Sequence, residues 1–217
     1  MTKARPILFS TEMVKAILED RKKQTRRTKN LDKFNVNPDL YKYLGLNINK
    51  NVHIFGFKTE RGALEKESLK CPYGKPGDIL WVRETFTKEA TIFNDTPADY
   101  IYKADELLCE NEIKWKPSIF MPKEACRLFL KIKDIRVERL IEISEEDAMA
   151  EGIDFQFSEL FQENRFMDYL DINSDYRTAY CSFQSLWEKI NGLDSWKANP
   201  WVWVIEFEKI EKPEGWA

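Results

Sequence analysis

The stretch Leu128-Phe129-Leu130-Lys131-Ile132-Lys133-Asp134-Ile135-Arg136-Val137-Glu138-Arg139-Leu140 decides the fold, because apolar and polar residues alternate along almost all of it. A period of two places alternate side chains on opposite faces of a β-strand. Leu130 and Ile132 share one face, and Ile135 continues it after a slip of one residue. We therefore predict one long strand over residues 128–140, with a bend or bulge at Asp134.

Shorter runs of β-branched and aromatic residues predict further strands on both sides of this one. They cover Arg5–Phe9, residues 52–57, Ile79–Phe86, Tyr100–Lys103 and Trp201–Phe207. Apolar residues at helical spacing predict three helices. These run from Ser10 or Thr11 to about Arg21, from Ser144 to Gly152, and over Arg177–Ile190.

The order of these elements limits the fold class. Helices do not alternate regularly with strands, which argues against a doubly wound parallel sheet. We predict an α+β fold: a small mixed or mostly antiparallel β-barrel with peripheral helices and inserted loops. The 217 residues suit a single domain over 1–217, with insertions at 30–70 and 153–176. Residues 30–50 of the first insertion resemble a loop with a short helix over Pro38–Leu44, followed by the strand predicted at 52–57.

Composition excludes several classes of protein. Hydrophobic residues make up 43% of the chain, which is enough for a core and argues against a disordered tail. No run approaches the roughly 18 apolar residues that a membrane span needs. The first six residues also lack the apolar region of a signal peptide. We therefore expect a soluble, cytoplasmic protein with no membrane partner.

Histidine and cysteine are too sparse for several common chemistries. His53 is the one histidine, in the apolar run Val52-His53-Ile54-Phe55, and a packed structural role is favoured over a catalytic one. Catalytic triads built on histidine are therefore disfavoured. The cysteines at 71, 109, 126 and 181 lack the close spacing of a zinc or redox pair. We expect free thiols, no bound metal and no cofactor.

Charge is concentrated at the start of the chain. Residues 1–30 carry a net charge of +6, whereas the whole chain carries -3. A basic N-terminal segment in an otherwise acidic chain fits a local anion or phosphate site better than it fits a protein that covers long nucleic acid. A solvated charged face is an equally simple interpretation. The run Arg21–Lys29 is expected as a turn or short strand at the surface or at the mouth of a pocket.

Several motifs together resemble the ASCH superfamily, whose members have a small PUA-like β-barrel. One set is Arg21-Lys22-x-x-Thr25-x-Arg27, Pro76-Gly77-Asp78, Ser144 to Glu151, and Val202–Phe207. A second set resembles the phage-encoded branch of that superfamily: Arg5–Phe9, Cys71–Gly74, Trp81–Glu84, Tyr102-x-x-Asp105, Trp115–Pro122 and Asn199–Trp203. The resemblance implies a PUA-like barrel and, for a phage-encoded protein, the cytoplasm of a bacterial host.

The resemblance also implies candidate catalytic residues. One ASCH group, the bacterial N4-acetylcytidine amidohydrolases, removes the acyl group from an acylated cytidine. Its proposed Lys, Thr and Glu match Lys22, Thr25 and Glu151. A Thr hydroxyl needs a base, and neighbouring positive charge or burial can lower the pKa of Lys22 enough for it to accept a proton. Glu151 can hold Lys22 or protonate the leaving amine, and Arg27 or backbone N–H groups can stabilise an oxyanion.

Aromatic residues beside polar ones suggest a pocket for a flat ligand. Stacking plus hydrogen bonds to the base edge is how unstacked nucleobases are held. The predicted ligand-binding residues are Arg26, Arg27, Trp81, Arg83, Glu84, Tyr102, Asp105, Trp115 and Ser118. Core packing explains Trp81 and Trp115 equally well at this stage.

These patterns leave three functions open. The first is a metal-independent hydrolase, most simply an amidohydrolase acting on an N4-acylated cytidine, with a nuclease as a further possibility. The second is a non-catalytic module that binds RNA or a modified base. The third is a phage protein that acts on host machinery. The expected partner is a nucleoside, a nucleotide or single-stranded nucleic acid, and the sequence does not fix the oligomeric state.

Overall fold

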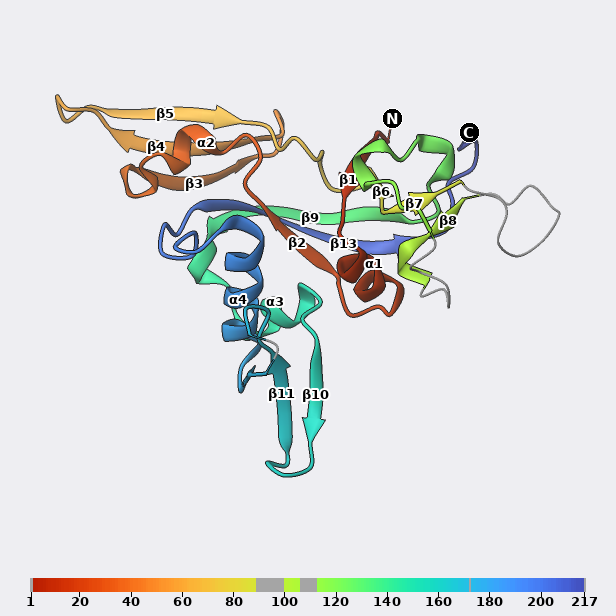
Figure 1. The fold of residues 1–217 in the computed structure, drawn as a ribbon. Coiled ribbons are helices and arrows are strands. Elements are labelled where there is room, and N and C mark those ends of the chain that lie inside the picture. Colours follow the sequence, from red (N-terminus) through yellow and green to blue (C-terminus); the bar gives the residue numbers. More distant parts are fainter. Residues whose placement is uncertain (1, 89–99, 106–112, 172, 217) are drawn as a thin grey trace.

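A five-stranded sheet in the order β1-β6-β9-β13-β2 forms the centre of the molecule (Figure 1). The computed structural model describes residues 2–88, 100–105, 113–171 and 173–216. The strands are β1 (Ala4–Leu8), β6 (Ile79–Arg83), β9 (Phe129–Arg139), β13 (Trp201–Ile210) and β2 (Gln24–Arg27). β1 and β6 are parallel, and the other neighbouring pairs are antiparallel. The predicted mixed α and β architecture is therefore confirmed.

The strands β9 and β13 form the longest pair in this sheet. Their ladder shifts register between Glu206 and Phe207, where Asp134 and then Ile132 are the opposing residues. Lys133 is thus the extra residue of a bulge, one position from the predicted bend. Without this shift, Ile132 and Ile135 would point to opposite faces, because side chains alternate along a strand. Both are buried in the same core.

Helix α1 (Thr11–Leu18) covers one face of the curled sheet. Ser10 caps it by accepting a hydrogen bond from the backbone N–H of Met13, as expected for this residue type. Its Val14 and Ile17 pack with sheet residues into the main core. The helix ends earlier than predicted, because Asp20 has a φ of 59°, in the left-handed region that stops an α-helix.

The two edges of the sheet approach each other without pairing. Arg27 Nη2 of β2 donates a hydrogen bond to the carbonyl oxygen of Leu8 in β1 at 2.8 Å. Phe9, directly after β1, packs against Phe207 of β13 with ring centroids 6.2 Å apart. Among the described strands no backbone ladder joins β1 to β2, so a closed barrel is not present as a hydrogen-bonded sheet.

The insertion at 30–70 is a small sheet and not a loop. It contains α2 (Asp32–Asn35), a 3₁₀ turn η1 (Pro38–Leu40), and the antiparallel strands β3 (Tyr41–Asn47), β4 (Val52–Lys58) and β5 (Leu64–Leu69). The predicted helix over Pro38–Leu44 is present only as the 3₁₀ turn over Pro38–Leu40, because Tyr41 begins β3, whereas the strand predicted at 52–57 is confirmed as β4. A register shift between Tyr43 and Gly45 breaks the alternation of β3, which hid this strand from the sequence pattern. Phe55 meets the edge of Trp201 in β13 with ring centroids 5.4 Å apart, which joins the insertion to the main core.

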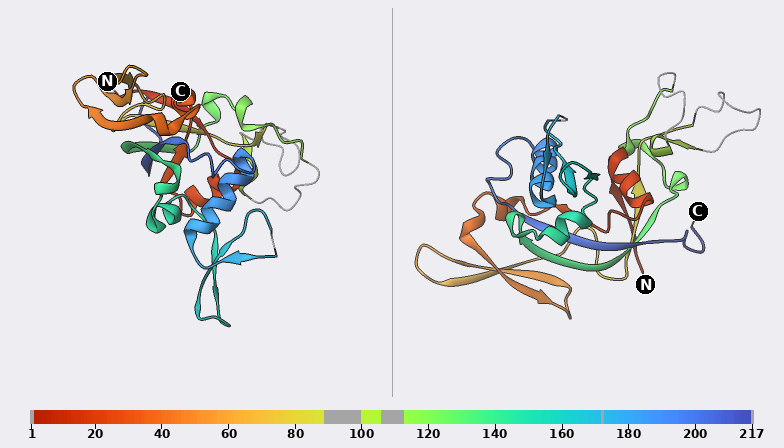
Figure 2. Two further views of the ribbon diagram at one scale, coloured as in Figure 1. Left: turned by 90° about the vertical axis from the view of Figure 1, so that its left-hand side faces the viewer. Right: turned by 90° about the horizontal axis from the view of Figure 1, so that it is seen from below.

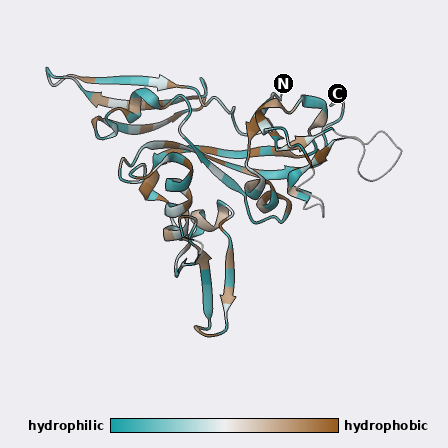
Figure 3. Ribbon diagram, viewed as in Figure 1, coloured by the Kyte–Doolittle hydropathy of each residue, from teal (hydrophilic) through white to brown (hydrophobic). Residues whose placement is uncertain are grey.

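A second layer lies on the other side of β13. It comprises α3 (Glu145–Ala150), α4 (Ala179–Asn191), the hairpin β10 (Phe155–Ser158) and β11 (Glu163–Met167), and the short β12 (Asp175–Tyr176). The predicted helices after Ser144 and over Arg177–Ile190 are thus confirmed, with the second beginning at Ala179. α4 shows both brown and teal in Figure 3, as expected for a helix with one apolar face. Its Phe183 and Trp187 pack in a second core with Val202 and Val204.

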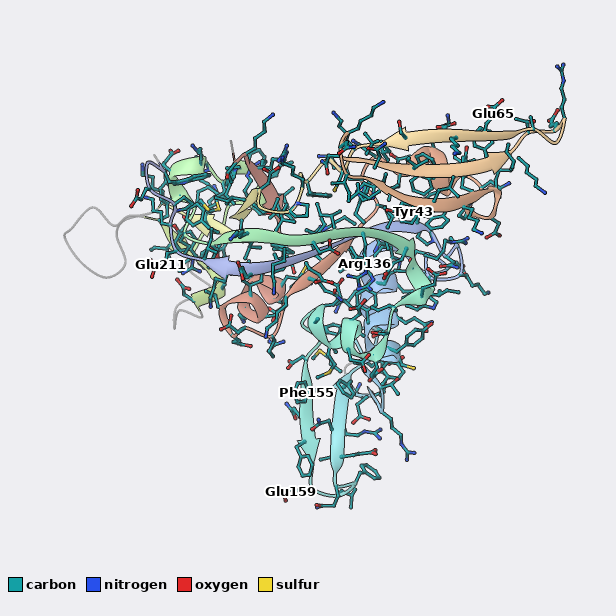
Figure 4. All side chains as sticks on the ribbon, turned by 180° about the vertical axis from the view of Figure 1, so that it is seen from behind. Tyr43, Glu65, Arg136, Phe155, Glu159 and Glu211 are labelled. Carbon is teal, nitrogen blue, oxygen red and sulfur yellow. The ribbon has the colours of Figure 1, made fainter. Side chains whose placement is uncertain are left out.

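Two segments project from this body. In Figures 1 and 2 the β3–β5 sheet and the β10–β11 hairpin extend from the central sheet in different directions. Figure 4 labels Glu159 at the tip of the hairpin, with Phe155 nearer its base. The insertion predicted at 153–176 is therefore largely a protruding hairpin.

A third group of apolar residues packs at the end of the sheet near both termini. It includes Phe86, Met121 and Phe129. The short β7 (Phe86–Thr87) and β8 (Ile101–Tyr102) and the 3₁₀ turns η2 (Lys103–Asp105), η4 (Ser118–Phe120) and η5 (Lys123–Ala125) lie in this part of the chain, and η6 (Leu140–Glu142) follows β9. The region between Pro117 and Pro122 is irregular, apart from η4.

The cysteines of the described chain are free thiols: Cys71, Cys126 and Cys181. Cys109 lies outside the described residues. Burial raises the pKa of Cys71 and of Cys126 to about 11, so both stay protonated at neutral pH. No helix in the described ranges has the length and apolar character of a membrane span.

His53 is packed, which agrees with the structural role predicted for it. Its Nδ1 is 2.9 Å from the Tyr43 hydroxyl, and its ring meets the edge of Trp203. Burial disfavours the charged imidazolium and lowers the pKa of His53 to about 4. Because the pKa is lowered on folding, the protein loses stability as the pH falls from about 6.5 toward 4, where the unfolded chain binds the proton first.

This shift can be measured directly, because the chain has one histidine. In a proton NMR titration, the imidazole resonance of the folded protein should stay constant between about pH 7.5 and 5.5. In urea the same resonance should titrate with a midpoint near 6.5, the ordinary value. A midpoint near 6.5 in the folded protein would show that the ring is solvated.

Candidate functional site

The basic segment that follows α1 contains the short strand β2 and lines a cavity, as one of the sequence-based alternatives predicted, but much of it is buried. Lys22, Gln24, Thr25 and Arg26 are each at most 5% exposed. β2 pairs with β13, placing Thr25 opposite Ile205. On the other side, the backbone N–H of Lys23 donates to the carbonyl oxygen of Ala150 in α3 at 2.8 Å. The segment is therefore enclosed between the central sheet and the helical layer.

Burial of this segment is possible because its charges are paired. Lys22 Nζ donates to Glu151 Oε2 at 2.8 Å and to the backbone oxygen of Glu151 at 2.7 Å. Their side chains are 1% and 4% exposed. Burial lowers the pKa of Lys22, while the Glu151 carboxylate opposes this shift. A lysine in this state gives up a proton more readily than a solvated one.

Arg26 extends the pair into a network. Its Nη1 donates to Glu151 Oε1 at 3.1 Å, and its Nη2 donates to Asp147 Oδ2 at 2.8 Å and also bonds Glu138. Burial alone would lower the pKa of Arg26, but the carboxylates of Glu151 and Glu138 outweigh it and raise that pKa. Both oxygens of the Glu151 carboxylate thus accept a hydrogen bond from a buried cation.

Arg136 of β9 completes the network from the sheet side. It bonds Asp147 and Glu206, and its Nε donates to Glu138 Oε2 at 3.0 Å. Figure 4 shows Arg136 where the central sheet meets the helical layer. The sheet and α3 are therefore joined by charged side chains as well as by packing.

Local backbone geometry brings Lys22 and Glu151 together. Ser144 caps α3 by accepting from the N–H of Asp147 at 3.1 Å, which fixes where the helix begins. The helix ends at Ala150, and Gly152 follows with a φ of +83°. A Cβ on Gly152 would lie 2.7 Å from the Cβ of Lys22 and 3.0 Å from that of Ala16. Only glycine allows this approach.

A cavity of about 260 Å³ opens beside the network. Its wall combines residues of β2 and the segment after it with one face of α4, one residue of α1, the turn residue Tyr73 and Glu151. The lining residues are Met13, Thr25, Arg26, Arg27, Thr28, Lys29, Tyr73, Glu151, Phe183, Leu186, Trp187, Ile190 and Asn191. Polar groups thus lie on the side of β2, and apolar and aromatic groups lie mainly on the side of α4.

The structure brings the three candidate catalytic residues into one region. Thr25 and Glu151 line the same cavity, and Lys22 contacts Glu151. Lys22 itself does not line the cavity, because it lies behind Glu151 and contacts Phe9 on its other side, with Nζ 5.8 Å from the ring centroid. Glu151 is therefore the member of the ion pair that can meet a ligand.

The predicted ligand-binding residues divide into two groups. Arg26 and Arg27 line the cavity, and the other seven do not: Trp81, Arg83, Glu84, Tyr102, Asp105, Trp115 and Ser118. The expectation that these seven form a wall of the same pocket is thus corrected.

Arg127 explains why several of the seven lie together. Its Nε and Nη2 donate to the Glu84 carboxylate at 3.0 and 2.9 Å, and its Nη1 donates to Asp105 at 2.7 Å. Its guanidinium carbon also lies 3.9 Å from the centre of the Tyr102 ring. The acidic residues beside the Tyr102 ring therefore bind Arg127 and not a ligand.

The remaining members of that group have structural contacts. Arg83 Nε donates to the carbonyl oxygen of Met121 at 3.0 Å, and Trp81 packs against Trp216 with ring centroids 6.1 Å apart. The indole N–H of Trp115 is buried and has no partner in the described chain. The backbone oxygen of Ser118 accepts from the N–H of Met121 within η4.

Sequence reasoning missed the aromatic wall that the cavity does have. Phe183, Leu186, Trp187 and Ile190 form one stripe of α4, and their helical spacing predicted only a helix there. A helical stripe has the same period whether it packs on side chains or borders a cavity, so the sequence offers no signal to separate the two.

Comparisons with family models, with curated proteins and with solved structures found no match to this chain. The resemblance to the ASCH superfamily therefore remains a prediction.

The close packing at Gly152 leads to a test of how the site is built. Gly152→Ala should lower the free energy of unfolding by roughly 2–4 kcal/mol, because it adds both left-handed strain and a clash with Lys22. Gly62→Ala is the matched control, since its φ is +77° and a Cβ there meets nothing within 4 Å. It should cost only about 1–2 kcal/mol. Equal losses in urea denaturation would show that Lys22 moves aside freely.

Proposed function

We propose that the protein is a hydrolase acting on a modified nucleoside, most simply on the amide of an N4-acylated cytidine. One observation carries this proposal: Glu151, whose carboxylate is held by Lys22 and Arg26, lines the same cavity as Thr25. The resemblance to ASCH amidohydrolases points to Lys22, Thr25 and Glu151 independently of this geometry. It also implies a PUA-like barrel, and the contact between Arg27 of β2 and Leu8 of β1 at the two sheet edges supports that part of the proposal.

The chemistry follows from which groups meet the ligand. Thr25 Oγ attacks the acyl carbon, and Glu151 accepts the hydroxyl proton as the new ester bond forms. The C–N bond then breaks, and the proton passes from Glu151 to the leaving amine, which departs as cytidine. Water hydrolyses the acyl ester on Thr25, releasing the free acid. Lys22 does not meet the ligand, so we assign it to holding Glu151 in place.

The cavity suits a single nucleoside. At about 260 Å³ it is slightly smaller than the roughly 300–1,000 Å³ that is typical of small-molecule sites. Tyr73, Phe183 and Trp187 offer ring surfaces for a flat base, and Asn191 supplies amide groups for its polar edge. This arrangement is an aromatic pocket with a few polar groups, as is typical of base recognition.

A non-catalytic role in binding a modified base is the second candidate. It is favoured by the hydrogen bonds of Glu151, because each oxygen of its carboxylate already accepts one from a cation. A fully satisfied buried network holds the shape of a pocket without performing chemistry. This candidate predicts binding of N4-acylated cytidine with no turnover.

Substitutions at Thr25 separate the two candidates. Purified protein should release acetate from N4-acetylcytidine, measured by chromatography of the nucleoside product. Thr25→Val should reduce kcat by at least about a hundredfold, because it removes the nucleophile but keeps the shape of a β-branched residue. Thr25→Ser should retain measurable activity.

The controls test whether the site or the fold has changed. Glu151→Gln should also abolish turnover, whereas Glu163→Gln on the projecting hairpin should leave it unchanged. Circular dichroism and thermal unfolding establish that each variant is folded. Turnover that survives Thr25→Val would refute the Thr mechanism, and binding without turnover in the unmodified protein would establish the second candidate.

A further inference from the structure

Arg27 is a half-buried cation that forms no ion pair with the residues that the structure describes, although the charge of Glu151 acts on it from within the same cavity. Its guanidinium makes one hydrogen bond, from Nη2 to the Leu8 carbonyl oxygen at 2.8 Å, and lies 5.1 Å from the centre of the Phe9 ring. No carboxylate pairs with it among the residues that the structure describes. Burial lowers the pKa of Arg27, which reflects the cost of holding this charge away from water. A neighbouring anion would offset that cost.

The charges that line the cavity do not balance. Glu151 is the one carboxylate among the described lining residues, and its two oxygens are taken by Lys22 and Arg26. Arg27 and Lys29 remain on the wall, and neither has an ion pair within the described part of the chain. The cavity therefore carries an excess of positive charge toward any ligand that enters it.

Unpaired hydrogen-bond donors gather at the same cavity. Five buried side-chain polar atoms lack a partner in the described structure, and three belong to cavity-lining residues: Arg26 Nε, Arg27 Nε and Trp187 Nε1. All three are N–H donors. Buried polar groups in proteins almost always have partners, so an unpaired set of donors beside a cavity marks a place for an acceptor.

We propose that this cavity binds the phosphate group of a mononucleotide, with Arg27 and Lys29 contacting the phosphate. A phosphate group supplies both the negative charge and the several acceptor oxygens that the wall lacks. The inference deepens the proposed function and rests on it for the nucleoside part of the ligand. It also moves Arg27 from the oxyanion role predicted from the sequence to recognition of the phosphate.

The structure favours a free mononucleotide over a nucleic-acid strand. The cavity has room for about one nucleoside, and the chain as a whole carries a net charge of -3, which repels a long polyanion. A phosphomonoester also bears more negative charge per phosphate than a phosphodiester, which suits two cations on one wall. The substrate class is therefore a modified nucleotide with a terminal phosphate.

Isothermal titration calorimetry with cytidine, cytidine 5′-monophosphate, uridine 5′-monophosphate and inorganic phosphate tests this assignment. Cytidine 5′-monophosphate should bind at least about tenfold more tightly than cytidine, because charge-assisted hydrogen bonds are the strong ones. Arg27→Gln should reduce that ratio to about one. Lys29→Gln should reduce it severalfold, and it decides the test if Arg27→Gln does not fold, because Lys29 is exposed.

Arg177→Gln is the matched control. The Arg177 side chain is 74% exposed and lies outside the cavity, so this variant should keep the full ratio. Equal affinities for cytidine and its monophosphate in the unmodified protein would overturn the proposal. A short single-stranded oligocytidine that binds more tightly than the monophosphate would replace the mononucleotide with a nucleic acid.

The outcome is separate from that of the hydrolase assay. If N4-acetylcytidine is not hydrolysed but both monophosphates bind in a manner that depends on Arg27, the hydrolase proposal fails and the phosphate site stands. If hydrolysis occurs and the phosphate confers no advantage in binding, the phosphate site fails alone.

Discussion

The ion pair between Lys22 and Glu151 is the constraint on which the rest of the site depends. Two opposite charges this deeply buried must stay in contact, because separating them would leave each one without water or a partner. The pair links β2 to the end of α3, and Arg26 adds a second link to the same carboxylate. The position of the helical layer against the central sheet therefore follows from electrostatics as well as from apolar packing.

Elements with an unbroken period could be predicted from the sequence. β9 and β13 alternate or run apolar over many residues, and α4 carries a long apolar stripe, so each was found close to its true bounds. β3 was missed because a register shift after Tyr43 interrupts its alternation. β2 was expected as a turn or short strand at the surface or at the mouth of a pocket, and the burial of its charges was not foreseen. Its charges are buried with partners that come from more than 100 residues away in the chain, and a local pattern cannot reveal such partners.

In the candidate site, too, some residues could be predicted from the sequence and others could not. Lys22, Thr25 and Glu151 could be named from a motif resemblance, and their proximity depends on a glycine and a cap that are also visible in the sequence. The aromatic wall of the cavity could not be predicted from the sequence, because the apolar stripe on α4 has the same period as a helix face that packs in a core. The pairing of aromatic and acidic residues around Tyr102 suggested a base pocket, but that chemistry satisfies Arg127. An aromatic ring beside a carboxylate suits an arginine as well as a base.

Arg27 connects the architecture of the sheet to the properties of the cavity. Its guanidinium joins β2 to the carbonyl oxygen of Leu8 in β1, and the same group lines the cavity with unused donors. A ligand that accepts from those donors would reduce the cost of removing this charge from water. Binding and the curvature of the sheet are then thermodynamically linked, because whatever binds only the folded state stabilises it. The cavity beside β2, and not the contact between the two sheet edges, is thus the place where such a ligand would act on the fold.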